Sequence, residues 1–281
     1  MEGDSRQPPA AAIAWIDGPE GGRWGTPGSL AVPLSDRGLS LADGLFETVL
    51  VEGRRPRLLT QHLQRWRRGA TVLGLEPPPQ QERVAVLARE AIERSGIGSG
   101  ALRLNWSRGD GGRGLEPSAG PGRFWLQLSA ARPDFGSVSA GISRLERRNA
   151  ASQLSSCKTF AYGASVLARL EAQRAGQEES LLESTAGGLC CGTSANLLVR
   201  QPRGWWTPPL TSGCLPGVMR ARALALGLVQ EAPAPIGASQ LRHGALLINS
   251  LGCRPIRSLE GEVLPTWPEP EHFWRGLLAD D

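Results

Sequence analysis

The stretch Ser-Cys-Lys-Thr-Phe-Ala-Tyr at positions 156–162 contains Lys158, the single lysine among the 31 basic residues of a 281-residue chain. A guanidinium group keeps its proton in a protein, so arginine cannot be a nucleophile, a Schiff-base partner or a general base. An ε-amine can take all three roles once its pKa is lowered. Lys158 is therefore a candidate catalytic residue, and the alternative is a surface lysine without a function.

Regular elements are expected on both sides of Lys158. We expect a helix from Gly163 to about Gln173, whose dipole would favour the neutral form of the Lys158 amine. Strands are expected at about 138–145 and in a segment that ends at Arg200, with a hairpin return at Trp205-Trp206. The residues at 245–249 are typical of a buried strand.

The N-terminal part of the chain shows helical and then strand periodicity. Apolar residues at steps of four and three predict a helix, and they are Leu59, Leu63, Trp66, Ala70 and Leu73. A second helix is expected at about 83–95, ended by Gly96. Apolar and polar residues alternate over 102–107, as in a half-buried strand, and 123–129 is expected to pair with it.

The sequence Ala-Arg-Pro-Asp-Phe-Gly at 131–136 has the composition of a linker. Helices and strands are expected to interleave on both sides of it. We therefore predict two α/β domains, residues 1–130 and 137–281, with a cleft between them.

Composition restricts the classes of function. Hydrophobic residues make up 40% of the chain and the net charge is +4, without a basic block, which favours an anionic small-molecule substrate over nucleic acid. No apolar run approaches the roughly 20 residues that cross a bilayer. Five cysteines without a C-x-x-C pair indicate reduced thiols in a cytoplasm, and three histidines without ligand spacing indicate no metal site.

The segment Thr-Pro-Pro-Leu-Thr-Ser-Gly-Cys-Leu-Pro-Gly-Val-Met-Arg at 207–220 leads from a glycine turn into a helix expected at about 218–228. The first N–H groups of a helix have no partner within it and can bind an anion such as phosphate. An ordinary helix start is the alternative.

Several motifs together resemble the class IV aminotransferases, the fold-type IV pyridoxal-phosphate enzymes. In order, they are Asp-Arg-Gly-Leu (36–39), Asp-Gly-Leu-Phe-Glu-Thr (43–48), Arg65 in His-Leu-Gln-Arg, Lys158 in Lys-Thr-Phe-Ala-Tyr, Asn196 in Ser-Ala-Asn-Leu-Leu, and the 207–220 segment. The resemblance runs from about residue 13 to 256. It implies an α/β fold with mixed sheets, in which a small N-terminal domain and a larger C-terminal pseudo-barrel domain hold pyridoxal 5'-phosphate between them. It also implies a homodimer.

The resemblance implies roles for individual residues. Lys158 would form a Schiff base with the cofactor and act as a general base. The other residues expected to bind the cofactor are Arg65, Cys191, Asn196, Gly217, Val218, Met219, Asn249 and Ser250. Arg65 and the backbone at 217–219 would contact the phosphate, and the 249–250 loop matches the family's second phosphate loop more loosely. Tyr162 would tune Lys158 or pack against the cofactor, and a structural role is expected for His62.

Within the family, the sequence at 106–114 (Trp-Ser-Arg-Gly-Asp-Gly-Gly-Arg-Gly) is most similar to aminodeoxychorismate lyases of folate biosynthesis. These convert 4-amino-4-deoxychorismate into 4-aminobenzoate and pyruvate. Their substrate carries two carboxylates, which arginine binds well, so Arg103, Arg108 and Arg113 are candidate substrate-binding residues together with Tyr162. An aminotransferase that acts on branched-chain or D-amino acids with 2-oxoglutarate is the alternative. A catalytically weak homologue that binds the cofactor is a second alternative.

Cys191 departs from the family pattern. Its position, five residues before Asn196, normally carries a glutamate that pairs with the pyridinium nitrogen and strengthens the cofactor as an electron sink. A thiol is a weaker partner for the ring nitrogen, so either the electron sink is weaker or another residue takes the place of the glutamate. Glu183 is a candidate because it is near in sequence. Because the lyase reaction makes an aromatic ring, it tolerates a weaker sink, which favours the lyase.

Overall fold

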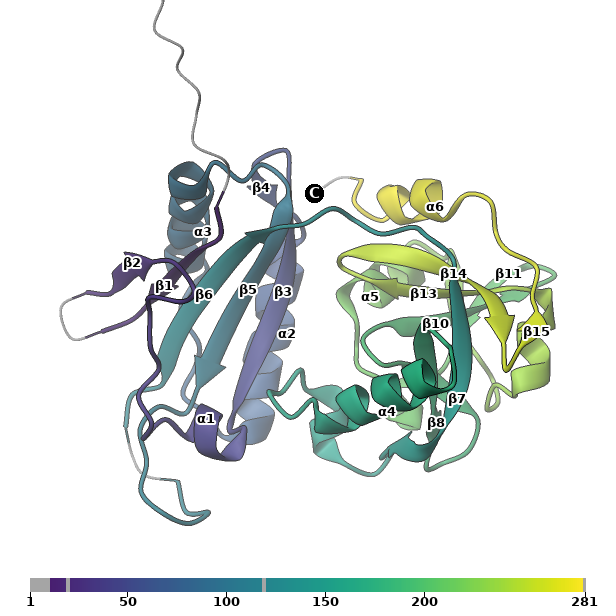
Figure 1. The fold of residues 1–281 in the computed structure, drawn as a ribbon, viewed down its shortest axis with the longest axis horizontal. Helices are drawn as coiled ribbons and strands as arrows, with labels where there is room; N and C mark the ends of the chain where they lie inside the picture. Colours follow the sequence, from purple (N-terminus) through teal and green to yellow (C-terminus); the bar gives the residue numbers. More distant parts are fainter. Residues whose placement is uncertain (1–10, 19–20, 118–119, 280–281) are drawn as a thin grey trace, which may run out of the picture.

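The computed structural model describes residues 11–18, 21–117 and 120–279. Figure 1 shows two lobes side by side, which we call the N-terminal lobe (β1–β6 with α1–α3) and the C-terminal lobe (β7–β15 with α4–α6). The chain crosses from one lobe to the other between residues 130 and 138, and the expected linker at 131–136 lies in this crossing.

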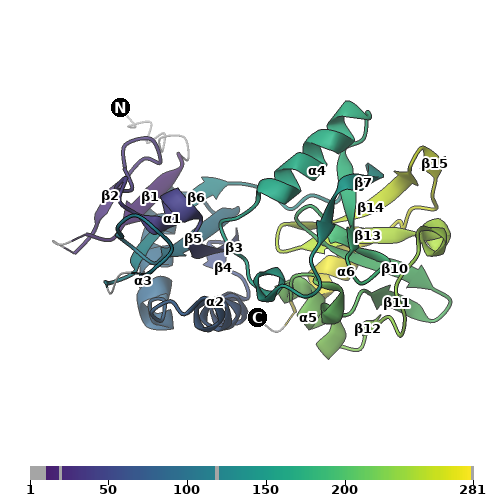
Figure 2. The same ribbon diagram turned by 90° about the horizontal axis from the view of Figure 1, so that it is seen from below.

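The N-terminal lobe is one antiparallel sheet with strand order β2-β1-β6-β5-β3-β4. Its strands are β1 (Ile13–Ile16), β2 (Arg23–Gly25), β3 (Gly44–Glu52), β4 (Arg55–Pro56), β5 (Gly100–Ser107) and β6 (Arg123–Ala130). Its helices are α1 (Arg37–Leu41), α2 (Leu59–Leu73) and α3 (Gln81–Ser95). Figure 2 shows α2 and α3 against the same face of the sheet, where apolar side chains from the helices and strands form the core of this lobe.

The predicted periodicities of this lobe are confirmed, with one correction. Helix α2 spans the predicted apolar stretch, and α3 ends at Gly96, which adopts a left-handed conformation with φ of 69°. Strands β5 and β6 pair in antiparallel register. A half-buried strand would expose its polar side, but in β5 this side is largely covered, since Asn105 and Ser107 are buried. That side faces Trp125 and the segment after Lys158, where Phe160 lies 5.6 Å from the Trp125 ring.

The C-terminal lobe contains a closed ring of six strands, in agreement with the expected pseudo-barrel. The order is β10-β13-β14-β7-β8-β9, and β9 returns to pair with β10 through Cys191 and Asn196. The strands of this lobe are β7 (Val138–Arg148), β8 (Glu179–Ser184), β9 (Leu189–Gly192), β10 (Asn196–Gln201), β11 (Gly204–Thr207), β12 (Val229–Glu231), β13 (Ala245–Asn249), β14 (Gly252–Leu259) and β15 (Glu262–Val263). The barrel therefore closes at two of the residues expected to bind the cofactor.

The helices of the C-terminal lobe are α4 (Gly163–Arg174), α5 (Val218–Ala225) and α6 (Pro270–Gly276). Helix α5 is shorter than the expected 218–228, because Gly227 with φ of 69° ends the helical conformation. The hairpin return at Trp205-Trp206 is confirmed as β11, which pairs antiparallel with β10. Strand β13 coincides with the predicted buried strand.

The segment that carries Lys158 joins the two lobes. The backbone N–H of Phe46 donates to the carbonyl of Lys158 at 2.9 Å, and the N–H of Phe160 donates to the carbonyl of Gly44 at 3.1 Å. Residues 158–160 thus lie as a short extra strand along the edge of β3. Gly44 is required there, because a Cβ atom would lie 2.2 Å from the Phe160 ring.

Three expectations from composition concern the described part of the chain. No helix in it is long and apolar enough to cross a membrane. No group of three or more His, Cys, Asp or Glu side chains in it is arranged to hold a metal ion. All five cysteines are free and buried.

Candidate active site

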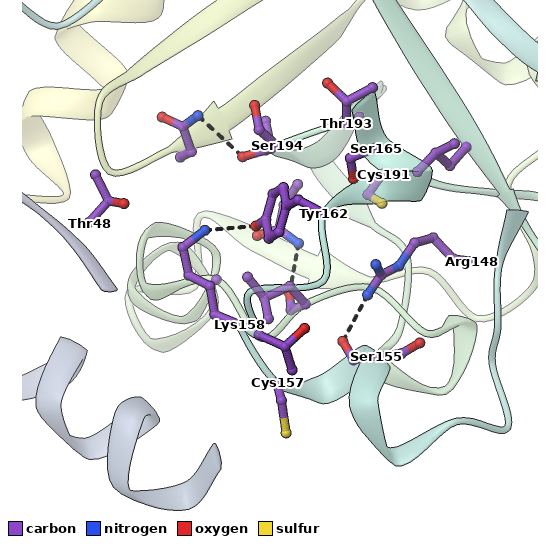
Figure 3. A pocket seen from close by; sticks show the side chains of 18 of the residues that line it. Thr48, Arg148, Ser155, Cys157, Lys158, Tyr162, Ser165, Cys191, Thr193 and Ser194 are labelled. Carbon is purple, nitrogen blue, oxygen red and sulfur yellow. Dashed lines mark hydrogen bonds between the residues drawn. The ribbon is translucent and has the colours of Figure 1, made fainter. Parts of the chain in front are cut away.

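A cavity of about 630 Å³ lies between β3 of the N-terminal lobe and the barrel, and Lys158 lines it (Figure 3). Most of the residues expected to form the site line this one cavity. They are Arg65, Arg103, Lys158, Tyr162, Cys191, Asn196, Gly217, Val218, Met219, Asn249 and Ser250. Residues that are 185 positions apart in sequence, from 65 to 250, thus meet at one place.

Lys158 is held in a defined orientation. Its Nζ atom donates to the hydroxyl of Tyr162 at 2.9 Å, and Figure 3 shows the two side chains pointing toward each other. The same Nζ lies 4.3 Å from the centroid of the Phe46 ring. The neighbouring Cys157 packs into the core of the N-terminal lobe and anchors the segment. The amine is therefore positioned from both lobes.

The start of α5 forms a cradle for an anion. Gly217, Val218 and Met219 line the cavity at the end of the helix where backbone N–H groups lack partners within the helix. The backbone at Gly217 approaches Asn196 so closely that a Cβ atom would lie 1.9 Å from its Oδ1 atom. Asn196 in turn donates from Nδ2 to the carbonyl of Leu215 at 2.9 Å, which fixes the turn before the helix.

Arg65 reaches the same cradle from α2. Its Nη1 atom donates to the carbonyl of Pro216 at 3.1 Å, and its Nε and Nη2 atoms donate to the two carboxylate oxygens of Glu47 at 2.8 and 2.5 Å. A guanidinium has five N–H groups. The three bonds use three of them, and Arg65 lines the same cavity as the start of α5, where an anion could accept from the other two.

Glu47 and His62 complete the support of this cradle. Positions 45, 47, 49 and 51 of β3 face α2 and α3, so the carboxylate of Glu47 lies on the helix side of the sheet. His62 lies between Glu47 and Ser250, with Nδ1 2.7 Å from Oε2 of Glu47 and Nε2 3.2 Å from Oγ of Ser250. Burial opposes ionisation of Glu47, but Arg65 and His62 outweigh it and hold its pKa at about 2.

Sequence reasoning underestimated these two residues. The 43–48 motif assigns no role to Glu47, and the sequence predicts a structural role for His62. The available signal is the carboxylate of Glu47 on the apolar side of β3, because a buried charge requires partners. The helix that follows offers an imidazole and a guanidinium three positions apart, those of His62 and Arg65. Phe46 and Thr48, on the opposite side of β3, also line the cavity and were not predicted.

Of the three candidate substrate-binding arginines, one lies in the cavity. The Arg103 guanidinium stacks 3.6 Å from the centroid of the Phe46 ring, and its Nε donates to Oδ1 of Asn105 at 2.8 Å. Burial lowers the pKa of Arg103. Arg103 and Lys158 therefore share Phe46 as a neighbour, and an anionic group of a substrate can approach both.

The structure does not bring the other two arginines to the cavity, which corrects the expectation that all three meet there. Arg108 donates to Asp43 at 2.7 and 3.2 Å and to the carbonyls of Leu73 and Gly74 at 2.8 Å each, so it ties β5 to the end of α2. Arg113 is exposed and does not line the cavity.

The cavity wall at Cys191 offers no carboxylate. Arg148 lies on the same side of the cavity in Figure 3 and donates to the carbonyls of Gly213 and Ser155 at 3.1 and 2.9 Å. Glu183 pairs with Arg147 at 3.1 Å and does not line the cavity, so it does not replace the missing glutamate. None of the described residues that line the cavity is an aspartate or a glutamate.

These residues fit pyridoxal phosphate at three of its groups. The amine of Lys158 suits the aldehyde, the start of α5 with Arg65 and Ser250 suits the phosphate, and the Tyr162 hydroxyl suits a polar atom of the ring. At Cys191, where the resemblance to the family leads us to expect the ring nitrogen, the described residues provide a thiol and no acid.

Comparison with known proteins identifies the family of the chain. The D-alanine aminotransferase of Bacillus licheniformis is 25% identical over 83% of this chain and 85% of its own. The bifunctional aminodeoxychorismate lyase / D-amino acid transaminase of Mycobacterium tuberculosis is 27% identical over 62% of each chain. The branched-chain amino acid aminotransferase from Escherichia coli has the same fold, with a TM-score of 0.83 at 21% identity over 95% of this chain and 94% of its own. The sequence model of the family described as "Amino-transferase class IV" matches residues 44–259. This chain therefore belongs to the class IV aminotransferases, a family of enzymes that depend on pyridoxal phosphate.

Proposed function

We propose that this enzyme converts 4-amino-4-deoxychorismate into 4-aminobenzoate and pyruvate. The observation that carries the proposal is the charge of the cavity wall, which five basic side chains and, among the described residues, no carboxylate line. Arg65 and Arg147 are paired with Glu47 and Glu183 outside the lining, which leaves Arg103, Arg148 and Lys158 as the charges without a carboxylate partner among the described residues. Such a wall suits a substrate with two carboxylates. It also leaves the cofactor's ring nitrogen without an acidic partner, which an aromatising elimination tolerates better than a transamination.

In the proposed mechanism, pyridoxal phosphate when bound supplies electron withdrawal from the substrate carbon that bears the amine. The amine of Lys158, held by the Tyr162 hydroxyl, removes the proton from C4. The electron pair of that C–H bond forms a double bond between C4 and C3 of the substrate as the C3–O bond breaks, and this double bond completes the aromatic ring. The departing enolpyruvate oxygen takes up a proton, and the enol becomes pyruvate. Arg103 binds a substrate carboxylate beside Lys158.

The second candidate is an aminotransferase for D- or branched-chain amino acids. It is supported by the names of the relatives, of which one is a D-alanine aminotransferase and another combines the lyase with a D-amino acid transaminase. A catalytically weak protein that binds the cofactor is the third, supported by the thiol of Cys191 in place of an acid.

A coupled assay separates the three. Purified holoenzyme is given chorismate with an aminating enzyme, and 4-aminobenzoate and pyruvate are measured by chromatography. We expect the two products in equal amounts. A parallel assay supplies D-alanine or leucine with 2-oxoglutarate, and glutamate formation without 4-aminobenzoate would replace the lyase by the aminotransferase. Cofactor binding without either product would identify the weak homologue.

Arg103 provides a test of substrate recognition. We expect Arg103→Met to lower kcat/KM for aminodeoxychorismate by roughly tenfold to a hundredfold, because a hydrogen bond to a charged group contributes about 1.5–3 kcal/mol. The change should appear mainly in KM and be measured from initial rates. Arg113→Met is the matched control, since Arg113 is exposed and outside the cavity. An equal loss in both variants would argue against carboxylate binding by Arg103.

We also propose that the enzyme is a homodimer of two-domain subunits, with residues 1–130 and 137–281 as the domains. The resemblance to the family supports the dimer. Large apolar side chains exposed on the N-terminal lobe, Leu34 at 88% and Leu115 at 84%, support it as well.

A further inference from the structure

A continuous hydrogen-bonded chain leads from Arg65 through Glu47 and His62 to Ser250. Each link is short, with Arg65 bound to both oxygens of Glu47, His62 Nδ1 2.7 Å from Glu47, and His62 Nε2 3.2 Å from Ser250 Oγ. Glu47 and His62 are 0% and 1% exposed, whereas Arg65 and Ser250 line the cavity. The two ends of this hydrogen-bonded series, Arg65 and Ser250, thus line the cavity where the cofactor phosphate fits. Its two inner residues, Glu47 and His62, are buried.

The positions of the protons along this chain follow from the donors and acceptors. Glu47 has a pKa of about 2, so its carboxylate only accepts hydrogen bonds, and His62 must therefore carry a proton on Nδ1. Burial lowers the pKa of His62 against the effect of Glu47, and the charges of Arg65 and Lys158 lower it further. A neutral His62 with its proton on Nδ1 has none on Nε2, which then accepts a hydrogen bond from the hydroxyl of Ser250.

A phosphate at the start of α5 requires the Ser250 hydroxyl to donate its hydrogen bond to the phosphate instead of to His62. A serine hydroxyl has one proton to donate. While that proton is directed at His62, the oxygen lone pairs of Ser250 face the cavity and oppose a phosphate dianion. If His62 is protonated on both nitrogens, Nε2 donates to Ser250 Oγ, and the Ser250 hydroxyl is free to donate to the phosphate.

We propose that His62 is a positioning residue for the cofactor phosphate, which takes up a proton from solvent when the phosphate binds and so turns the Ser250 hydroxyl toward it. The charged groups that face His62 are Glu47 from β3, Arg65 from its own helix and Lys158 from the segment beside β3. Glu47 favours the second proton and the two cations oppose it. A bound phosphate shifts this balance through Ser250, because the hydroxyl can donate to the phosphate only when Nε2 of His62 carries a proton. The inference is independent of whether the enzyme is a lyase or an aminotransferase.

The protonation state of His62 can be observed directly. The chain has three histidines, and the other two, His243 and His272, are exposed, so 15N-histidine labelling yields a spectrum that His243→Gln and His272→Gln assign. Near pH 7, we expect one protonated and one bare ring nitrogen in His62 of the phosphate-free apoprotein. We expect two protonated nitrogens in the holoenzyme and in apoprotein with inorganic phosphate. A neutral His62 in the holoenzyme would overturn the proposal.

Ser250→Ala tests whether the hydroxyl is the link. In this variant, loaded with pyridoxal phosphate, we expect His62 to remain neutral, because Nε2 no longer has an oxygen to orient. Two protonated nitrogens in loaded Ser250→Ala would show that His62 responds to the phosphate charge alone, and would overturn the positioning role.

The pH dependence of ligand binding is a second readout. Pyridoxamine 5'-phosphate is the ligand used, because it carries the phosphate but forms no Schiff base with Lys158. Phosphate binding raises the pKa of His62, so the gain in affinity is complete at low pH and is lost as pH rises through the pKa of the complex. Between the two pKa values, we expect the Kd of wild-type apoprotein to rise about tenfold per pH unit relative to Ser250→Ala. Equal slopes for the two proteins would contradict the proposal. Pyridoxamine without phosphate is the control and should show no difference in slope between the two proteins.

Discussion

Replacing Lys158 by alanine is expected to lower kcat by about 10⁴-fold or more, at or beyond the upper end of the range for a lost general base. Lys158→Arg should lose as much, although it keeps the positive charge, because a guanidinium does not release its proton. Both are measured as product formation by cofactor-loaded protein. Tyr162→Phe is the matched comparison, since it removes only the hydroxyl that orients the amine at 2.9 Å, and a smaller loss is expected.

Because Lys158 is the single lysine of the chain, its expected Schiff base with the cofactor can be tested directly. Reduction of the holoenzyme with borohydride, followed by peptide mass spectrometry, should place the cofactor on Lys158 and on no other side chain of the 281 residues. Lys158→Ala should retain its fold by circular dichroism and acquire no label at this peptide. Turnover within tenfold of wild type in either variant would remove Lys158 from the proposed chemistry.

Replacing Glu47 by alanine is expected to destabilise the protein by about 3–5 kcal/mol, because it leaves the buried guanidinium of Arg65 without its carboxylate. For a chain of this size, that corresponds to a fall in Tm of about 10 °C, measured by thermal unfolding of the apoprotein. Glu183→Ala is the control, since its ion pair with Arg147 lies at the surface and contributes about 0–1 kcal/mol. Similar losses in the two variants would contradict the buried network.

The same network predicts an acid dependence with a defined sign. The folded-state pKa of Glu47 is depressed from 4.5 to about 2, so its contribution to stability is complete above the unfolded-state value and is lost as pH falls toward 2. The stability difference between wild type and Glu47→Ala should therefore shrink over this range of pH.

Local patterns were sufficient for the elements that depend on local physics. The stripe of α2 and the glycine end of α3 follow from helical periodicity and from the left-handed conformation at Gly96. Helix α5 was predicted too long at its C-terminal end, because Gly227 with φ of 69° ends it sooner. Conversely, β5 was predicted with a half-exposed face because alternation alone does not reveal that another segment covers its polar side.

The choice among similar residues required the fold. Arg103, Arg108 and Arg113 are equivalent as sequence, but alternation along β5 directs Arg103 into the cavity, whereas Arg108 meets Asp43 at the end of the strand. Likewise, Glu183 is near Cys191 in sequence, yet its carboxylate pairs with Arg147 and does not line the cavity.

By itself, the sequence determined which groups are chemically able to act: one amine that can lose a proton, a helix start that can bind phosphate, and a thiol where an acid is usual. These properties belong to side chains and to short backbone segments, so they survive without knowledge of the fold. The tertiary structure decided how the groups meet. Lys158 reaches the cavity because residues 158–160 pair with the edge of β3, and His62 contacts Ser250 across 188 positions of the chain. Such contacts arise from strand pairing and lobe packing between distant segments, and no local pattern encodes them.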